Sequence, residues 1–279
     1  MDLLIITGIA LALMLNFVNG VNDASHSIAT VVETRALSPL KASVSSAIAN
    51  FIGPFMFTTA VAATIGTELV VPGAMTPLSL VVAMLVSIML ILAATHIGLP
   101  VSSSHALIGG ILGTGVAVAG LSALILPPAA TIRALVLFSL TGAGIGALIL
   151  SILAYYLEEG IRPALVLGVI FGISVTIPLM ILAGLLVLSG ILAIVVFIFI
   201  SPVIGFIAAF LFDLLVSHLF RFSRQNRMRR IFQPLQVAAS LFQAAGHGAN
   251  DGQHAVGVIC ALLLAGGLIP LFMVPLWVI

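Results

Sequence analysis

The stretch Pro163–Phe212 reads PALVLGVIFGISVTIPLMILAGLLVLSGILAIVVFIFISPVIGFIAAFLF, and its 50 residues include no charged side chain. At a rise of about 1.5 Å per residue, it corresponds to about 75 Å of α-helix. A helix that crosses the hydrocarbon core of a membrane needs about 20 apolar residues. The stretch therefore predicts at least two membrane-spanning helices.

The rest of the chain is similarly apolar. Of its 279 residues, 62% are hydrophobic and 6% are charged, and its mean hydropathy is +1.38. Too few polar side chains remain to cover a water-facing surface, which excludes a soluble globular protein. The net charge of +1 argues against a nucleic-acid partner, and the lone Cys260 cannot form an intrachain disulfide. The expected partner is the lipid bilayer.

Other apolar windows of spanning length predict roughly nine membrane segments and an all-α polytopic membrane protein. Besides the segments within residues 163–216, these windows centre near residues 3–20, 42–65, 76–97, 104–126, 134–157, 231–247 and 254–270. A last apolar segment, Pro270–Ile279, has only about half the length of a span. We expect the chain to continue beyond it; a short interfacial tail anchored by Trp277 is the alternative.

Five of the nine Lys and Arg residues fall within residues 221–230, namely Arg221, Arg224, Arg227, Arg229 and Arg230. Basic residues beside spans concentrate on the cytoplasmic side of the membrane. The cluster predicts a cytoplasmic loop in a multi-pass protein of the cell (plasma) membrane.

Two of the eight acidic residues, Asp23 and Asp251, lie inside apolar runs rather than at termini, loops or span ends. A charge at the centre of a bilayer costs about 2.5–3.5 kcal/mol on insertion scales, so such residues are candidates for function. Their surroundings match: Asn19–His26 reads NGVNDASH and His247–His254 reads HGANDGQH, at a constant offset of 228.

In a helix, the polar members of each motif fall at positions i, i+3, i+4 and i+7, which share one face. Two such polar stripes near opposite ends of a chain suggest a duplicated transporter whose halves are often inverted. Gly20 and Gly248 are expected to interrupt the helices and free carbonyl groups for a cation. The alternative is that the stripes only join helices through buried hydrogen bonds.

A second polar segment, Thr95–His105, lies between two apolar runs and reads THIGLPVSSSH. Pro100 disfavours helix at the preceding residue, and Ser102, Ser103 and Ser104 favour the start of a new helix. As the tip of a re-entrant hairpin covering residues 95–110, this segment would offer hydroxyls and free N–H groups to an anion. A turn outside the membrane is the alternative.

An anion site beside buried carboxylates predicts symport. Asp23 and Asp251 would bind Na⁺ or carry H⁺, and the cation would offset the charge of an oxyanion. His26 and His254 are candidates for proton coupling because imidazole titrates near neutral pH. We expect no enzymatic activity, no cofactor and no metal other than Na⁺.

At these motifs the chain resembles the inorganic phosphate transporter (PiT) family, especially its shorter prokaryotic members. Residues 19–39 resemble the first family signature, and residues 246–254 resemble its second copy. Residues 98–105 resemble the family's Gly-x-Pro-Val-Ser-Thr-Thr-His hairpin, with serines in place of threonines. His26 stands where Asn is common in the family, and His254 where Asn or Lys is common.

The resemblance implies a symporter of two inverted repeats with discontinuous helices, which imports inorganic phosphate with Na⁺ or H⁺, and it makes a homodimer plausible. It implies that Ser102, Ser103 and Ser104 bind phosphate oxygens. It also implies that Asn22, Asp23, Asn250 and Asp251 coordinate the cation and complete the substrate cavity. No second hairpin motif follows His254, so the second repeat is expected to be truncated, without half of the anion site.

The predicted domains are an N-terminal repeat at 1–157, connecting spans at 163–220, the basic loop at 221–230 and the start of a C-terminal repeat at 231–279.

Three other functions remain open. A sulfate permease of the same family would use the same hydroxyls. A membrane-embedded metalloenzyme would use the Asp-x-x-His pairs, Asp23/His26 and Asp251/His254, as metal ligands. A channel would need a hydrated path.

Overall fold

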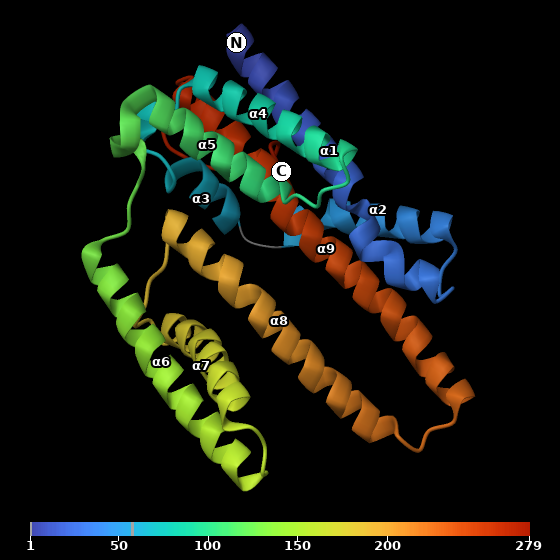
Figure 1. The fold of residues 1–279 in the computed structure, drawn as a ribbon. Helices are drawn as coiled ribbons and strands as arrows, with labels where there is room; N and C mark the ends of the chain where they lie inside the picture. Colours follow the sequence, from blue (N-terminus) through green and yellow to red (C-terminus); the bar gives the residue numbers. More distant parts are fainter. Residues whose placement is uncertain (1, 57–58) are drawn as a thin grey trace. The chain divides into compact units, whose positions relative to one another are not determined.

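The computed structural model describes residues 2–56 and 59–279, apart from the side chain of Ala24, and the described chain is almost entirely helical (Figure 1). This confirms the all-α prediction. The helices are α1 (Leu3–Glu33), α2 (Pro39–Met56), α3 (Ala60–Thr67), α4 (Pro77–His96), α5 (Ser103–Ala119), α6 (Ala129–Tyr156), α7 (Ile161–Leu182), α8 (Gly190–Phe220) and α9 (Gln225–Ala265), with short 3₁₀ turns at Pro72–Ala74 and Gly120–Ala123.

Several helices begin where their sequences offer a cap. The Asp2 side chain accepts a hydrogen bond from the Leu4 N–H at the start of α1. Thr76 and Ser79 form a capping box at α4, with Pro77 in the first turn. Such caps satisfy backbone N–H groups that have no partner inside the helix.

Six of the described helices are long and apolar enough to cross a membrane: α1, α4, α5 with the 3₁₀ turn that follows it, α6, α7 and α8. Helices α2 and α3 pass the same test only as a pair, bent by 72°. The sequence predicts roughly nine spans, and one reason for the difference is that window 231–247 and most of window 254–270 belong to the single helix α9, which ends at Ala265. The polar middle of α9 lowers its mean hydropathy.

The expected breaks at Gly20 and Gly248 are wrong. Helix α1 is continuous from Leu3 to Glu33, and α9 from Gln225 to Ala265. Their backbone carbonyls therefore stay within the regular hydrogen-bonding pattern of the helix. Among the described helices, α2 and α3 form a bent pair that is either a broken span or a re-entrant loop.

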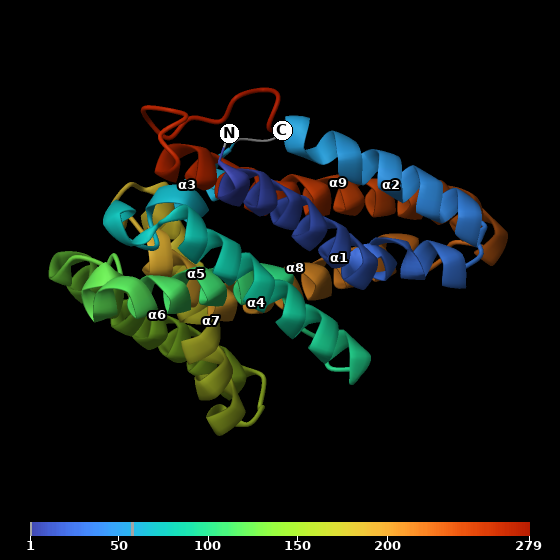
Figure 2. The same ribbon diagram turned by 90° about the horizontal axis from the view of Figure 1, so that it is seen from above.

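One compact unit contains the chain up to Ile125 together with Ser223–Ile279. Within it, α1 and α9 run antiparallel, α2 and α3 pack on α9, and α4 and α5 form a hairpin beside α1 (Figures 1 and 2). Gly248 lets α9 approach α2 closely, because a Cβ there would overlap the Asn50 carbonyl. The unit therefore brings the N-terminal motif, the serine segment and the C-terminal motif close together.

Leu126–Phe222 forms the second unit, which contains α6, α7 and α8. Small residues allow α6 and α7 to pack backbone against backbone; they are Gly142, Gly146, Gly168 and Gly172. Ile177, Leu186 and Ile200 form a buried apolar cluster between α7 and α8. The two units are defined by which helices pack together, and they do not test the sequence repeats at 1–157 and 231–279. Those repeats remain predictions.

The loop that contains the basic cluster is shorter than the predicted loop at 221–230. Helix α8 ends at Phe220 and α9 begins at Gln225, so only residues 221–224 connect the two helices. Arg227, Arg229 and Arg230 lie in the first turns of α9 instead of in a loop.

The two motif glycines are expected to respond differently to alanine. Gly248→Ala should lower the free energy of unfolding by about 1–3 kcal/mol, because the new methyl meets the α2 backbone. Gly20→Ala should change it by less than about 1 kcal/mol, because nothing lies within 4 Å of the added Cβ. Thermal unfolding of the purified protein in detergent measures both; equal losses would contradict the packing assigned to Gly248.

Candidate functional site

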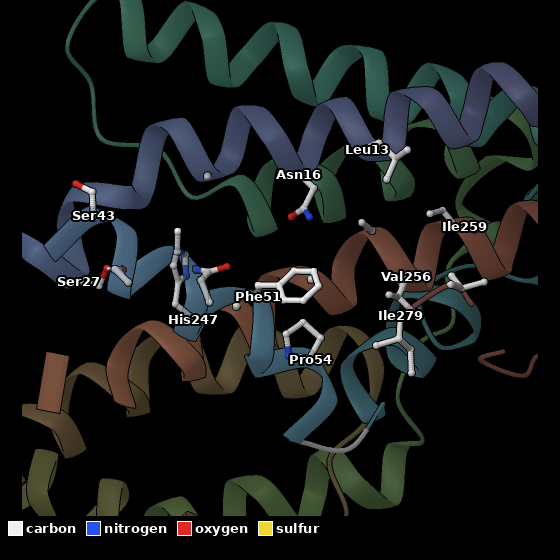
Figure 3. A pocket seen from close by; sticks show the side chains of 18 of the residues that line it. Leu13, Asn16, Ser27, Ser43, Phe51, Pro54, His247, Val256, Ile259 and Ile279 are labelled. Carbon is white, nitrogen blue, oxygen red and sulfur yellow. Dashed lines mark hydrogen bonds between the residues drawn. The ribbon is translucent and has the colours of Figure 1, made fainter. Parts of the chain in front are cut away.

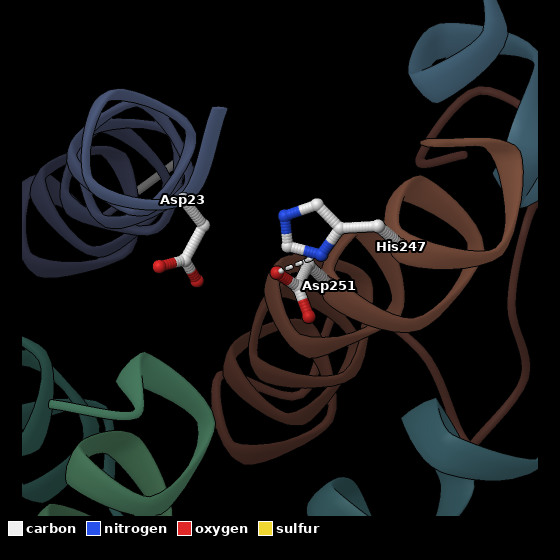
Figure 4. Close-up of side chains that lie close together, drawn as sticks. All are labelled: Asp23, His247 and Asp251. Atoms are coloured by element: carbon white, nitrogen blue, oxygen red, sulfur yellow. Dashed lines mark ion pairs between the residues drawn. The ribbon is translucent and has the colours of Figure 1, made fainter. Parts of the chain in front are cut away.

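The antiparallel pairing of α1 and α9 brings the two polar stripes together. The Asn19 Nδ2 group donates a hydrogen bond of 2.6 Å to Asp251 Oδ2. Asp23 faces His247 and Asp251 from the opposite helix, and one ligand atom of each of these three residues lies within 4.8 Å of the others (Figure 4). The two aspartates, 228 positions apart in sequence, therefore belong to one cluster.

The contacts between the stripes follow the sequence repeat. The offset of 228 relates Asn19 to His247 and Asp23 to Asp251. When this offset is applied to the contacting pair Asn19 and Asp251, it gives the pair His247 and Asp23, which also lie close together. The two contacts therefore join equivalent motif positions, with an amide beside one aspartate and an imidazole beside the other.

Both carboxylates are mostly buried and surrounded by nitrogen atoms. The Asp251 side chain is 12% exposed, with His247 Nδ1 at 3.1 Å and His254 Nδ1 at 3.9 Å from its oxygens. The Asp23 side chain is 15% exposed and accepts a 2.9 Å hydrogen bond from Asn22 Nδ2. Two ionised carboxylates within 4.8 Å of each other would repel by at least about 3.5 kcal/mol at an effective dielectric constant of about 20, so the cluster favours an added positive charge.

The serine segment forms the tip of the α4–α5 hairpin, and the predicted helix start is confirmed. Ser102 is the N-cap of α5, and its Oγ accepts a hydrogen bond of 3.4 Å from the His105 N–H. At the other leg, Gly98 adopts φ +72°, a conformation that suits glycine, directly after α4. The first turn of α5 thus contains backbone N–H groups without a partner inside the helix, next to the serine hydroxyls.

Each leg of the hairpin is bonded to an asparagine near the middle of α1. Ser103 Oγ, on α5, donates a hydrogen bond to Asn19 Oδ1. Thr95 Oγ1, in the last turn of α4, donates one of 2.9 Å to Asn22 Oδ1. These bonds place the hairpin tip beside the carboxylate cluster. Because α4 and α5 are each long enough to cross a membrane, the re-entrant hairpin stays a prediction.

A cavity of about 310 Å³ lies between the hairpin tip and the facing stripes. Its lining combines three serines, two carboxylates, two imidazoles, an amide and a further hydroxyl: Ser102, Ser103, Ser104, Asp23, Asp251, His26, His247, Gln243 and Ser27. Hydrogen-bond donors for an anion and carboxylates for a cation thus line the same space.

Not every predicted residue lies at this cavity. Asn250 is on the exposed side of α9. His254 approaches Asp251 but is not part of the lining, and the His26 side chain lines the cavity while remaining 71% exposed.

Four residues of the cluster and its lining, Asn19, His247, Gln243 and Ser27, are not among the predicted ligands. Asn19 and His247 are the first members of their stripes, and Gln243 lies one helical turn before His247 on the same face. Asn19 and His247 are thus already in the predicted stripes, and extending the second stripe by one turn adds Gln243.

A larger cavity of about 480 Å³ lies between α1, α2, α9 and the last residues (Figure 3). Much of its lining is apolar, including Leu13, Phe51, Pro54, Val256 and Ile279. It contains neither aspartate of the cluster, so the smaller cavity is the candidate functional site.

Comparison with known proteins agrees with these motifs. Residues 19–171, more than half of the chain, match the phosphate transporter family. The chain belongs to this family. Family membership confirms the predicted resemblance and, because the relatives are named as transporters, argues against an enzyme.

Two relatives are similar over nearly the whole chain. It is 33% identical over 272 residues to a probable low-affinity inorganic phosphate transporter of Rhizobium meliloti (strain 1021), covering 97% of the chain and 63% of that protein. It is 29% identical over 273 residues to a protein of the same description from Bacillus subtilis (strain 168), covering 96% and 63%. The chain thus spans just under two thirds of their length.

A solved structure described as "The sodium-dependent phosphate transporter" has a similar fold. The TM-score is 0.60 at 19% sequence identity, over 99% of this chain and 72% of that one. At this identity the likeness concerns the fold, and it supports a multi-pass helical membrane protein.

Cysteine labelling tests the cavity. The chain's one cysteine, Cys260, is fully buried, so single-cysteine variants can be made in a Cys260→Ala background. Ser104→Cys and Gln243→Cys line the cavity and should react with a small charged thiol reagent in membranes. The control Ser87→Cys, at a position with no exposed surface on α4, should react at least about tenfold more slowly because only exposed thiolates react readily. Equal rates at all three positions would contradict the assigned cavity.

Proposed function

We propose that this protein imports inorganic phosphate by symport with Na⁺ or H⁺, using the cavity between the α4–α5 tip and the α1–α9 stripes. The observation that carries the proposal is the lining: three serine hydroxyls at a helix start and two carboxylates border one space of about 310 Å³. Family membership and the names of the relatives support phosphate as the substrate.

The serine side of the cavity suits an oxyanion. Ser102, Ser103 and Ser104 supply hydroxyl donors, and the first turn of α5 supplies backbone N–H groups. A helix N-terminus also carries a partial positive charge that favours anions.

The carboxylate side explains why a cation must accompany the anion. Asp23 and Asp251 already repel each other and would repel phosphate in the same cavity. A bound Na⁺ or proton removes part of both repulsions, so each ligand strengthens binding of the other. This mutual stabilisation is the thermodynamic basis of symport.

The residues in and beside the cavity support both cations in different ways. For Na⁺, the oxygen ligands would come from side chains, because α1 and α9 continue through Gly20 and Gly248 and free no carbonyls. The sodium dependence named for the structurally similar transporter supports Na⁺. For H⁺, His26 and His254 are close to the two carboxylates. Uptake driven separately by a Na⁺ gradient and a pH gradient distinguishes the two.

We further propose that the protein lies in the cell membrane with residues 221–230 on the cytoplasmic side. The support is the concentration of five arginines there, a charge bias typical of cytoplasmic segments.

Neutralising either carboxylate is expected to abolish coupled uptake. Asp23→Asn and Asp251→Asn remove the charge that attracts the cation while keeping the side-chain shape. Labelled phosphate uptake into membrane vesicles, with an imposed Na⁺ or pH gradient, should fall at least about 100-fold, as expected when a coupling of about 3 kcal/mol is lost.

The control for this experiment is Asp213→Asn on α8, an exposed acid in the other unit, which should retain wild-type uptake. All variants are first checked for membrane insertion. Wild-type cation dependence in both Asp23→Asn and Asp251→Asn would refute the proposed coupling role.

Competition separates phosphate from sulfate. Near neutral pH phosphate carries O–H groups that a cavity carboxylate can accept, whereas sulfate offers acceptors only. Unlabelled phosphate and arsenate should therefore reduce uptake of labelled phosphate at concentrations at least about tenfold lower than sulfate, a difference of about 1.4 kcal/mol. Stronger competition by sulfate would favour a sulfate permease.

A further inference from the structure

We propose that Asn19 and Asn22 are positioning residues that couple the two ligands, because each amide connects a hydroxyl of the hairpin to a carboxylate of the cluster. The inference rests on the proposed symport and adds how occupancy of the cation site reaches the phosphate-binding serines.

The first connection runs through Asn19, which is buried, with 6% of its surface exposed. Its Oδ1 accepts a hydrogen bond from Ser103 Oγ, and its Nδ2 donates one of 2.6 Å to Asp251 Oδ2. Both ends of one amide are therefore in use, one toward the hairpin and one toward the opposite helix.

The second connection has the same order of groups. Thr95 Oγ1 lies 2.9 Å from Asn22 Oδ1 and 2.8 Å from the Ile91 carbonyl oxygen, so its one hydroxyl hydrogen is shared between these two acceptors. Asn22 Nδ2 donates a hydrogen bond of 2.9 Å to Asp23 Oδ1. The hydroxyl–amide–carboxylate order thus occurs twice, less than one helical turn apart on α1. The two connections start from opposite legs of the hairpin, since Thr95 is on α4 and Ser103 is on α5.

An amide has a fixed donor end and a fixed acceptor end. A charged carboxylate holds the donor end strongly, which leaves the acceptor end directed at the hairpin hydroxyl. While Asp251 is charged and has no cation, Asn19 therefore occupies the hydroxyl hydrogen of Ser103. That hydrogen is then not free to bond a phosphate oxygen.

A cation on Asp251 weakens its hold on the Asn19 amide. The amide can then turn, and the Ser103 hydroxyl is released to donate to phosphate. In the reverse direction, phosphate that binds Ser103 leaves Asn19 Oδ1 without its donor, and this oxygen becomes available to the cation side. Asn22 would couple Asp23 to the α4 leg of the hairpin in the same way, through its hydrogen bond with Thr95. The two binding events then favour each other, as linkage requires.

The test compares the affinity for labelled inorganic phosphate with and without the cation that drives uptake, on the purified full chain. The wild-type ratio should lie in the range of about 5- to 150-fold found for coupled sites. Asn19→Leu should reduce this ratio at least about fivefold. It should also raise the cation-free affinity for phosphate, because the Ser103 hydroxyl is no longer occupied by the amide.

Thr95→Val provides a second variant that keeps the side-chain shape at an exposed position, so it tests the proposal even if Asn19→Leu does not fold. It should also lower the ratio. The matched control is Thr114→Val on α5, whose hydroxyl donates only to the Gly110 and Ile111 carbonyls of its own helix in the described contacts. This control should keep the wild-type ratio.

A wild-type ratio in Asn19→Leu or Thr95→Val would overturn the proposal. So would an equal loss of phosphate affinity with and without the cation in Asn19→Leu, since that is the result of structural damage alone. Failure of the wild-type chain to bind phosphate under either condition would instead overturn the proposed function itself.

Discussion

Two carboxylates held within 4.8 Å of each other are the constraint on which the site depends. In an apolar protein this approach is unfavourable unless positive charge or hydrogen-bond donors compensate. The described contacts supply hydrogen bonds from the Asn19 and Asn22 amides. They also place the Nδ1 atoms of His26, His247 and His254 between 3.1 and 3.9 Å from the carboxylate oxygens. The antiparallel crossing of α1 and α9 brings these groups together, and the close packing of α9 on α2 at Gly248 supports that crossing.

The α4–α5 hairpin adds hydrogen-bond donors for an anion beside the carboxylate cluster. Its serines offer donors to an anion, and bonds from both of its legs to α1 place them beside the carboxylates. The same asparagines thus support the hairpin and bond the acids. In the proposed arrangement the anion and cation sites share a wall, and occupancy of one site would change the hydrogen bonds available at the other. A channel would not need such a connection, whereas a symporter does.

Residues whose chemistry is unusual for their surroundings could be predicted from the sequence. Asp23 and Asp251 were identifiable because charge is costly in an apolar run, and the serines because Pro100 and a following apolar helix imply a cap. The pairing of Asn19 with Asp251 could not be predicted, because it depends on how two helices cross. The motif position of Asn250 predicts a ligand, whereas the structure places this residue on the exposed side of α9. The helix break predicted at Gly248 is wrong, because a glycine that permits close packing and a glycine that breaks a helix look alike in sequence.

The most direct test of the shared cavity is an experimental structure of the protein with inorganic phosphate and the coupling cation bound. We expect a tetrahedral anion bonded to Ser102, Ser103 and Ser104 at the start of α5. We expect the cation, when Na⁺ is used, between Asp23 and Asp251. Phosphate bound away from the hairpin tip, for example at the arginines near the start of α9, would contradict the shared cavity.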